Sequence, residues 1–226
     1  MALTKVSSGT AKEQGLLAAE EVNQNSIYLF TKRLMDVVGA ICGLIFLLPI
    51  FVIVAMVIKI EDPKGPVFFK QTRVGKDGKE FGMYKFRSMV TDAEERLKDL
   101  LQYNEVSGAM FKMKVDPRVT KIGKFIRKTS IDELPQLLNV LKGDMSLVGP
   151  RPPLQREVKE YNSYDKQRLL VTPGCTGLWQ VSGRSNTGFK EMVALDIIYI
   201  QRRSIFLDIK IIVRTFRVLI GSKDAF

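Results

Sequence analysis

The chain contains no histidine, only two cysteines and a single tryptophan among its 226 residues. The lack of histidine excludes catalysis by a serine–histidine or cysteine–histidine pair, and it excludes metal sites built on imidazole ligands. Cys42 and Cys175 lie far apart and match neither a disulfide framework nor a zinc-binding spacing. The soluble part of the protein is therefore expected in a reducing compartment such as the cytosol.

Acidic residues are scarce relative to basic ones. The sequence has 35 lysines and arginines against 24 aspartates and glutamates, which gives a formal net charge of +11 at pH 7. This excess favours an anionic partner, such as an acidic lipid or a phosphorylated substrate. The cations are not gathered into one block and no nucleic-acid-binding motif is present, so nucleic acid is not an expected partner.

An uncharged apolar run covers residues 37–58, a length of 22 residues, and lies beyond a polar leader at residues 1–25. As one straight helix the run would be about 33 Å long, which is enough to cross a bilayer. Lys32 and Arg33 precede the run and Lys59 follows it, so the basic flanks do not decide its orientation.

Pro49 interrupts this run. A proline removes one backbone donor and clashes with the preceding turn, so the helix is expected to bend there into arms of about 12 and 9 residues. Each arm is too short to cross the membrane alone. The run is therefore either a kinked span or a hairpin that enters and leaves through one membrane face. Composition alone favours the span, because re-entrant segments are rare.

Residues 66–87 carry the pattern of a β-hairpin. Asp77-Gly78 is a strong turn signal between the two strands. Lys85 and Arg87 are two residues apart in the returning strand and therefore share one face of the sheet. Such cations are more often solvated residues of an edge strand than ligands for an anion, and both interpretations stay open.

Local signals predict several further elements. Thr91 and Glu94 form a capping box, which predicts a helix from there to about residue 103. Strands are predicted at residues 110–115 and 178–181, and a helix is predicted at about 188–201.

The last apolar pattern, at residues 205–220, is amphipathic. Its apolar residues share one helical face, and Lys210, Arg214 and Arg217 lie mostly off that face. This pattern suits an interfacial helix on anionic lipid and, equally, a helix packed on the domain core with its basic side in water.

Residues 130–153 are the most informative stretch. Ser130 and Glu133 form a second capping box, which predicts a helix that begins there and ends at Gly143. Acidic residues in a first turn interact favourably with the helix dipole by about 0.3–1 kcal/mol, so capping alone accounts for Glu133. Asp132 is surplus to the capping box and calls for another explanation.

Cations surround this predicted helix start. Arg127 precedes it, and Arg151 stands between two prolines that stiffen its segment. Arginine binds phosphate through paired hydrogen bonds, and an ionised aspartate can attack phosphorus as a nucleophile. Carboxylate oxygens suit Mg²⁺, which also shares substrate phosphate oxygens. Asp132 and Glu133 therefore indicate a magnesium-dependent site that handles phosphates.

The sequence as a whole resembles the bacterial sugar transferases, the monotopic polyprenyl-phosphate phosphoglycosyl transferases. The resemblance covers residues 28–222 and rests on several separated motifs: KFRSM at 85–89, IDELPQLLNVLKGDMSLVGPRP at 131–152, PGCTGLWQVSGR at 173–184, and Asp196 with Tyr199.

This resemblance implies transfer of a sugar 1-phosphate from a UDP-sugar to polyprenyl (undecaprenyl) phosphate, with release of UMP, as the first membrane step of bacterial glycoconjugate or exopolysaccharide synthesis. It implies that Asp132 is the nucleophile of a covalent phosphosugar intermediate and lies near Mg²⁺, and that Glu133 is a base or proton shuttle. The substrate-binding candidates that the family motifs supply are Lys85, Arg87, Arg127, Arg151, Arg184 and Asp196.

The resemblance also implies an α/β, mostly helical, membrane-associated catalytic domain. Residues 26–62 would form a re-entrant hairpin that breaks at Pro49, which replaces the span favoured by composition. Residues 63–226 would form a catalytic domain on the cytosolic face of the bacterial cytoplasmic membrane, ending in an interfacial helix. Larger members of the family carry a multi-span membrane domain ahead of this module, so the chain is expected to be a minimal unit or part of a longer protein.

Two other functions stay open from the sequence. A non-enzymatic basic membrane adaptor would use the surface charge alone, with Asp132 and Glu133 only capping a helix. A glycosyltransferase that moves only the sugar would release UDP in place of UMP.

Overall fold

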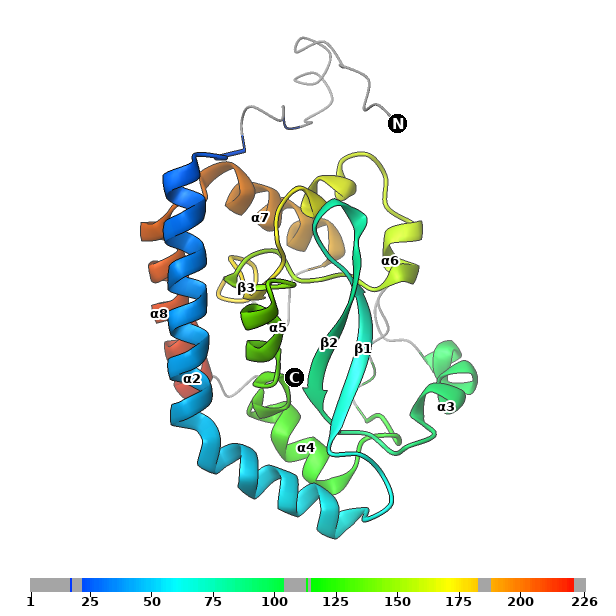
Figure 1. Ribbon diagram of the computed structural model, residues 1–226. Coiled ribbons are helices and arrows are strands. Elements are labelled where there is room, and N and C mark those ends of the chain that lie inside the picture. The colour runs from blue at the N-terminus through cyan, green and yellow to red at the C-terminus, as the bar shows by residue number, and fades with distance from the viewer. Residues whose placement is uncertain (1–16, 18–21, 104–112, 114, 183–187, 222–226) are drawn as a thin grey trace.

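Helices make up most of the described part of the chain, as the sequence indicates. The computed structural model describes residues 17, 22–103, 113, 115–182 and 188–221 (Figure 1). Arg184, most of the polar leader and most of the strand predicted at residues 110–115 lie outside the described residues.

The apolar run belongs to one continuous helix, α2, which covers Ser26–Glu61 and has 36 residues. The Asn25 side chain caps its first turn and accepts a hydrogen bond from the Ile27 N–H at 2.9 Å. Pro49 lies inside this helix, so a break of the helix at Pro49 is not confirmed. Figure 1 shows that α2 changes direction along its length, a behaviour that a missing backbone donor favours.

One face of α2 packs on the rest of the protein, in the first half of the helix and again in the second. The buried residues recur at helical spacing in both halves: Tyr28, Lys32, Asp36, Ala40, Val54 and Ile58. The other faces expose large apolar side chains, among them Phe46, which is 86% exposed. The helix is long and apolar enough to cross a membrane, yet it is attached to the domain near both ends.

Strands β1 (Phe68–Val74) and β2 (Glu80–Phe86) form the predicted hairpin as an antiparallel pair. Asp77 and Gly78 adopt positive φ angles of 57° and 76° in the short turn η2 (Lys76–Gly78), as the Asp-Gly signal indicates. The hairpin prediction is therefore confirmed.

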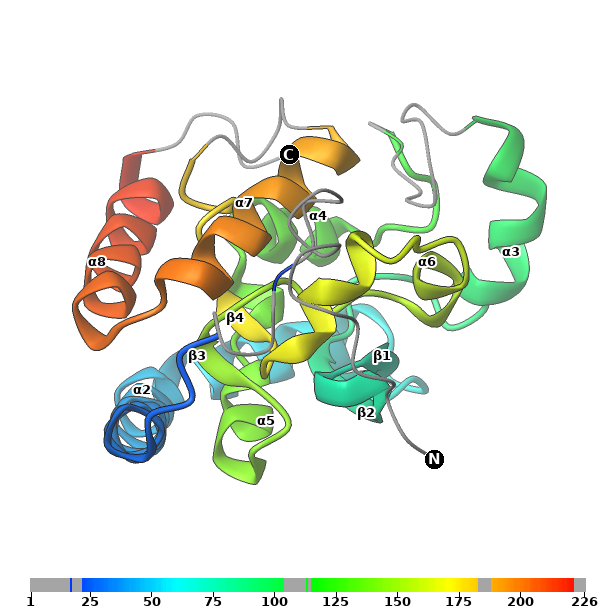
Figure 2. The same cartoon turned by 90° about the horizontal axis from the view of Figure 1, so that it is seen from above.

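Helix α5 (Gln136–Lys142) lies between α2 and the hairpin in both views (Figures 1 and 2). Asn139 on α5 is fully buried and joins α5 to strand β2 of the hairpin. Its side-chain oxygen accepts from the Tyr84 N–H at 2.9 Å, and its side-chain nitrogen donates to the Gly82 carbonyl at 2.8 Å. A buried amide satisfied in this way fixes the position of β2 against α5.

The remaining elements cover the other side of α5 and the far side of the hairpin. Two three-residue strands, β3 (Ser146–Val148) and β4 (Gly174–Thr176), pair in parallel. The helical elements, in chain order, are α3 (Ala93–Leu100), η3 (Leu101–Tyr103), α4 (Lys121–Lys128), η4 (Ile131–Glu133), α6 (Gln155–Lys159), η5 (Asp165–Leu170), α7 (Phe189–Arg202) and α8 (Ile205–Gly221).

The helices predicted at residues 91–103, 188–201 and 205–220 are confirmed, although no side-chain hydrogen bond caps the first of them. The strand predicted at residues 178–181 is wrong, because those residues form a turn and the strand comes earlier, at Gly174–Thr176. The close approach of Gly149 and Gly174 explains the shift. A Cβ atom on Gly174 would lie 2.0 Å from the Gly149 nitrogen, so only glycine allows the chains to pair there.

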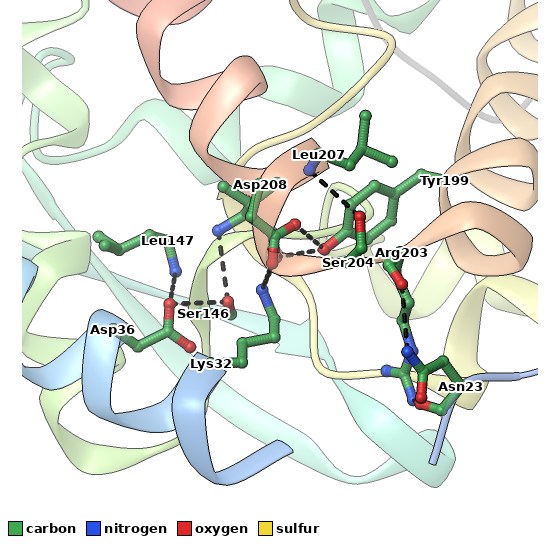
Figure 3. Close-up of polar contacts among 11 residues, drawn as sticks. Asn23, Lys32, Asp36, Ser146, Leu147, Tyr199, Arg203, Ser204, Leu207 and Asp208 are labelled. Carbon is green, nitrogen blue, oxygen red and sulfur yellow. Dashed lines mark hydrogen bonds and ion pairs between the residues drawn. The ribbon is translucent and has the colours of Figure 1, made fainter. Parts of the chain in front are cut away.

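A buried polar cluster joins α2 to α7, α8 and β3 (Figure 3). The Lys32 ammonium donates to Asp208 Oδ2 at 2.8 Å and to the Val148 carbonyl at 3.0 Å. The Tyr199 hydroxyl donates to the other Asp208 oxygen at 2.7 Å. Lys32 is 8% exposed and Asp208 is fully buried, so this ion pair lies inside the protein rather than on its surface.

Two more charged residues of α2 bind the domain. Asp36 Oδ1 accepts from the Ser146 hydroxyl at 3.0 Å and from the Leu147 N–H at 2.9 Å, as Figure 3 also shows. Arg33 donates to the Val140 and Leu141 carbonyls near the C-terminal end of α5, at 2.6 and 2.8 Å. These contacts fix α2 relative to β3 and α5.

The Lys32–Asp208 pair generates a stability prediction. Asp208→Asn leaves the Lys32 ammonium buried without its counter-ion, so we expect a loss of about 3–5 kcal/mol in the free energy of unfolding. The double variant Lys32→Met/Asp208→Leu removes both charges, and the Tyr199 hydroxyl can still donate to the Val148 carbonyl, 3.1 Å away. We expect the double variant to be clearly more stable than Asp208→Asn in thermal unfolding of the detergent-solubilised protein.

The matched control is Arg96→Gln, which breaks the exposed Arg96–Asp92 pair and should change stability by less than about 1 kcal/mol. A double variant as unstable as Asp208→Asn would contradict the ion-pair explanation.

Candidate active site

Asp132 and Glu133 lie in one turn of 3₁₀ helix, η4, between α4 and α5. The predicted capping box is not formed. Ser130 adopts a left-handed conformation with φ 56°, its side chain makes no capping hydrogen bond, and α5 begins only at Gln136, after Pro135. The predicted helix end at Gly143 is confirmed, with φ 90°. Neither carboxylate is therefore used for capping.

Glu133 instead pairs with Lys85 on β2, whose ammonium donates to Glu133 Oε1 at 2.7 Å. Burial opposes ionisation of Glu133, but the Lys85 ammonium, with help from Arg151 and Arg73, outweighs it and holds the pKa of Glu133 below its ordinary value. The hairpin thus contributes Lys85 to the site, as the sequence predicts, and Glu133 remains ionised and half-exposed.

Asp132 has the opposite environment. The residue is 5% exposed, and its Oδ1 atom is buried without a hydrogen-bond partner among the described residues. Burial raises the pKa of Asp132, the Lys85 ammonium opposes that effect, and the neighbouring Glu133 carboxylate adds to it. Arg127 on α4 also favours the ionised form. A buried carboxylate oxygen without a partner is available to a cation or to an electrophile.

Arg87 is not brought to the two carboxylates. It follows the last residue of β2, and its guanidinium donates to the Asp62 side chain at 2.5 Å and to the Asp62 carbonyl at 2.9 Å. Asp62 is the C-cap residue that follows α2, so Arg87 attaches the hairpin to the end of that helix. The sequence predicts Lys85 and Arg87 on one face of the strand. Arg87 lies beyond the strand, because β2 ends at Phe86.

Arg151 lies in the segment that links β3 to α6. Its Nη1 atom is 3.5 Å from Glu157 Oε2, and its positive charge lowers the pKa of Glu133, so it belongs to the same site as Lys85. Arg184, the other arginine predicted to hold phosphate or nucleotide, lies outside the described residues.

Asp196 is fully buried and does not line an open site. Its Oδ2 atom accepts from Arg168 Nε at 2.8 Å, and Arg168 in turn donates to the Arg151 carbonyl at 3.1 Å and to the Tyr161 hydroxyl. Its other carboxylate oxygen, Oδ1, is buried without a hydrogen-bond partner among the described residues. Through Arg168, Asp196 supports the segment that carries Arg151, and its role in substrate binding stays a prediction.

Sequence analysis missed Arg73 on β1. This guanidinium is 5% exposed and donates to the Pro152 carbonyl at 3.0 Å, one residue after Arg151. Its charge also lowers the pKa of Glu133. The missed signal is positional, because Arg73 points inward from the first strand of the hairpin, whose cations the sequence analysis did not consider.

The donor set fits a magnesium ion with few protein ligands. Within the described residues, no three histidine, cysteine, aspartate or glutamate side chains converge. Asp132, with its unpartnered oxygen, and the adjacent Glu133 are the carboxylates available. Mg²⁺ is commonly held by one or two carboxylates together with waters and substrate phosphates, so these residues would suffice.

Comparison with known proteins identifies the family of this chain. Residues 27–222 match the family described as bacterial sugar transferase. The chain belongs to the bacterial sugar transferase family. The family resemblance predicted from the sequence motifs is thereby confirmed.

Similar relatives include the galactosyl transferase CpsE of Streptococcus agalactiae, 56% identical over 194 residues, which are 85% of this chain and 43% of that protein. The undecaprenyl-phosphate galactose phosphotransferase of Salmonella typhimurium is 44% identical over 201 residues, 87% of this chain and 42% of that protein. The exopolysaccharide production protein ExoY of Rhizobium meliloti is 39% identical over 199 residues, 86% of this chain and 88% of that protein. The chain thus spans about two fifths of the first two relatives and most of the third.

The opposed environments of the two carboxylates generate a pH prediction. The pKa of Asp132 is raised in the folded protein, so the folded protein binds a proton on this carboxylate more tightly than the unfolded chain does. The ionised Asp132 therefore lowers the free energy of unfolding once the pH exceeds the ordinary aspartate pKa of about 4. We expect Asp132→Asn to raise the unfolding midpoint at pH 7.5, in EDTA and without substrate, by roughly 2–6 °C. The gain should shrink as the pH approaches 4.

Asp99→Asn, at an exposed carboxylate on α3, is the control and should leave the midpoint unchanged at both pH values. An Asp132→Asn protein that is less stable than the wild type at pH 7.5 would show that this carboxylate is stabilised rather than strained.

Proposed function

We propose that this protein transfers a sugar 1-phosphate from a UDP-sugar to polyprenyl phosphate and releases UMP. The observation that carries the proposal is the unpartnered, buried oxygen of Asp132 beside an ionised Glu133–Lys85 pair. Family membership supports it, and the Salmonella relative is named for a phosphotransfer to undecaprenyl phosphate. The relatives' names include both galactose and N-acetylgalactosamine, so they do not single out one sugar.

In the first step, an Asp132 carboxylate oxygen attacks the phosphorus that bears the sugar. A new O–P bond forms, the P–O bond to the UMP phosphate breaks, and UMP leaves with that electron pair. Burial of Asp132 removes the water that would otherwise solvate the nucleophile and compete for the phosphorus. Lys85 and Arg127 keep enough positive charge nearby for the carboxylate to ionise.

In the second step, an oxygen of the polyprenyl phosphate attacks the same phosphorus and expels the Asp132 carboxylate, which yields a polyprenyl diphospho-sugar. Glu133 is half-exposed and held ionised by Lys85, so it is suited to accept a proton from the incoming phosphate. Mg²⁺ bound at these carboxylates would neutralise phosphate charge in both steps.

The two rival functions account less well for the environment of Asp132. A membrane adaptor has no use for a buried carboxylate without a partner, which costs folding free energy. A transferase that moves only the sugar would form its new bond at the anomeric carbon and would leave both phosphates on the nucleotide, so the cations Lys85 and Arg127 would not face a phosphorus under attack. Release of UMP rather than UDP separates that last alternative from our proposal.

We further propose that α2 enters and leaves the bacterial cytoplasmic membrane through the cytosolic face. Both halves of α2 pack on one body, through Lys32 and Asp36 near its start and through Ile58 near its end. A helix that crossed the bilayer would place one of these attachment points on the far side. Exposed apolar residues on α8, such as Phe206 and Phe216, give the same body a second lipid-facing surface.

Asp132→Asn tests the mechanism. An amide cannot form the acyl phosphate, so we expect UMP release from a UDP-sugar to fall by at least about 10³-fold, a loss typical of a missing nucleophile. Wild-type protein quenched during turnover should show a phosphosugar mass on the peptide that contains Asp132. EDTA should stop UMP release and Mg²⁺ should restore it, and Asp99→Asn should retain wild-type activity. Turnover without any adduct on Asp132 would refute the covalent mechanism.

Single cysteines at Gln24 and Lys64, two exposed positions flanking α2, test the membrane topology. In intact spheroplasts of a Cys42→Ala/Cys175→Ala background, neither position should react with a membrane-impermeant maleimide, and both should react after lysis. Lys98→Cys on α3 serves as the cytosolic reference. Labelling of one flank before lysis would establish a crossing span.

A further inference from the structure

Two donor nitrogens on the Glu133 side of the site are buried and have no hydrogen-bond partner within the part of the chain that the structure describes. They are Nε of Arg73 and Nη1 of Arg151. The nearest carboxylate to the second, Glu157, is 3.5 Å away, too far for a hydrogen bond of good geometry. A charged donor left unpaired inside a protein costs more than the roughly 1–3 kcal/mol of a neutral one, so two of them in one place call for an explanation.

The backbone around these donors is fixed from both sides. Arg73 Nη1 donates to the Pro152 carbonyl at 3.0 Å, and the Val74 N–H donates to the Pro153 carbonyl at 2.9 Å. From the opposite side, Arg168 donates to the Arg151 carbonyl at 3.1 Å. The segment that carries Arg151 is thereby held against β1, next to the Arg73 guanidinium, without using either free nitrogen.

The second terminal nitrogen of Arg73 also makes a hydrogen bond. Its Nη2 donates to Gln71 Oε1 at 2.7 Å, so the guanidinium is held by both Nη atoms and its orientation is set. Nε is thus a donor in a fixed direction that no protein group accepts. A planar guanidinium held in this way is suited to a ligand whose oxygens match its geometry.

The local charge is unbalanced. The cations that act on this part of the site and on the adjoining Asp132 are Lys85, Arg73, Arg151, Arg156 and Arg127, and the carboxylates are Glu133, Glu157 and Asp132. Burial lowers the pKa of Arg73 and repulsion from Arg151 lowers it further, whereas Glu157 and Glu133 oppose this, each with a smaller effect than Arg151. Five positive charges against three negative ones leave room for an anion with about two negative charges, as a phosphate monoester carries.

We propose that Arg73 and Arg151 form a two-arginine site that binds a phosphoryl group beside Glu133. Arg73 Nε and Arg151 Nη1 would each donate to one oxygen of the group, which would satisfy both unpaired donors and balance the charge. This proposal rests on the proposed function in one respect: the phosphoryl group is taken to belong to one of the two substrates of the proposed reaction. Two sources share this chemistry: the nucleotide phosphate of the sugar donor, and the lipid phosphate of the acceptor.

Calorimetric binding in EDTA tests the two-arginine site without relying on turnover. The full chain is titrated in detergent with UMP in one arm and with a short-chain polyprenyl phosphate in the other. We expect Arg73→Gln and Arg151→Gln each to weaken binding of at least one of these phosphates by about 10–100-fold, the range for a lost charged hydrogen bond. Loss in the UMP arm alone assigns the site to the donor, and loss in the lipid arm alone assigns it to the acceptor.

Arg73→Lys separates ligand binding from a merely structural role. Lysine keeps the charge and can still donate to the Pro152 carbonyl, but it lacks the planar guanidinium that directs Nε to a second position, so we expect a near-wild-type unfolding midpoint with binding still weakened at least tenfold. Arg151→Gln keeps the backbone clamp, because its side chain makes no bond to it. These two variants decide the question where Arg73→Gln does not fold. Arg96→Gln, an exposed arginine on α3, should bind both phosphates as the wild type does.

Folded Arg73→Lys and Arg151→Gln proteins that bind both phosphates as tightly as the wild type would overturn the two-arginine site, even if UMP is released during turnover. Arginine-dependent phosphate binding in a protein that releases no UMP from any UDP-sugar would leave the two-arginine site standing and remove the proposed function.

Discussion

The contact on which the architecture depends is a buried ammonium–carboxylate pair between a lipid-compatible helix and the polar body of the protein. Lys32 and Asp208 are 176 residues apart in the sequence, and the Val148 carbonyl and the Tyr199 hydroxyl complete the cluster (Figure 3). Apolar packing alone would let α2 slide or rotate, because an apolar helix face meets lipid as favourably as it meets leucine. Directional polar contacts with Asp208 and Val148 give α2 one position.

The candidate site holds two neighbouring carboxylates in unlike surroundings. Asp132 is buried and leaves one oxygen unpaired, whereas Glu133 is half-exposed and paired with Lys85. Environments that push two pKa values in opposite directions are the usual basis for assigning different chemical roles to similar groups. Here the division follows from the 3₁₀ turn, which directs one side chain inward and the other toward β2.

Sequence reasoning selected the residues of the candidate site but not the contacts that shape it. Local signals sufficed for the β-hairpin, whose Asp77-Gly78 turn is nearly unambiguous, and for the helix end at Gly143. They failed at Ser130, where a left-handed residue replaces the cap that the spacing suggested. They did not reveal the partners of Arg87 and Asp196, because Asp62 and Arg168 are reached through the fold and no local pattern encodes them. Arg73 was missed for the same reason, since its burial depends on a segment about 80 residues away.

The link between Arg33 and the end of α5 has a geometric consequence. The two carboxylates lie in η4, just before α5, and α5 packs along α2. Leu137, near the start of α5, lies against Gly43, and carbonyls at the other end of α5 accept from Arg33. Under the proposed topology, this attachment would hold the Asp132 carboxylate at one height relative to the hydrocarbon. A lipid phosphate travels at a nearly constant height and moves sideways, so the two need to meet only by lateral diffusion in a plane, a far smaller search than one in three dimensions.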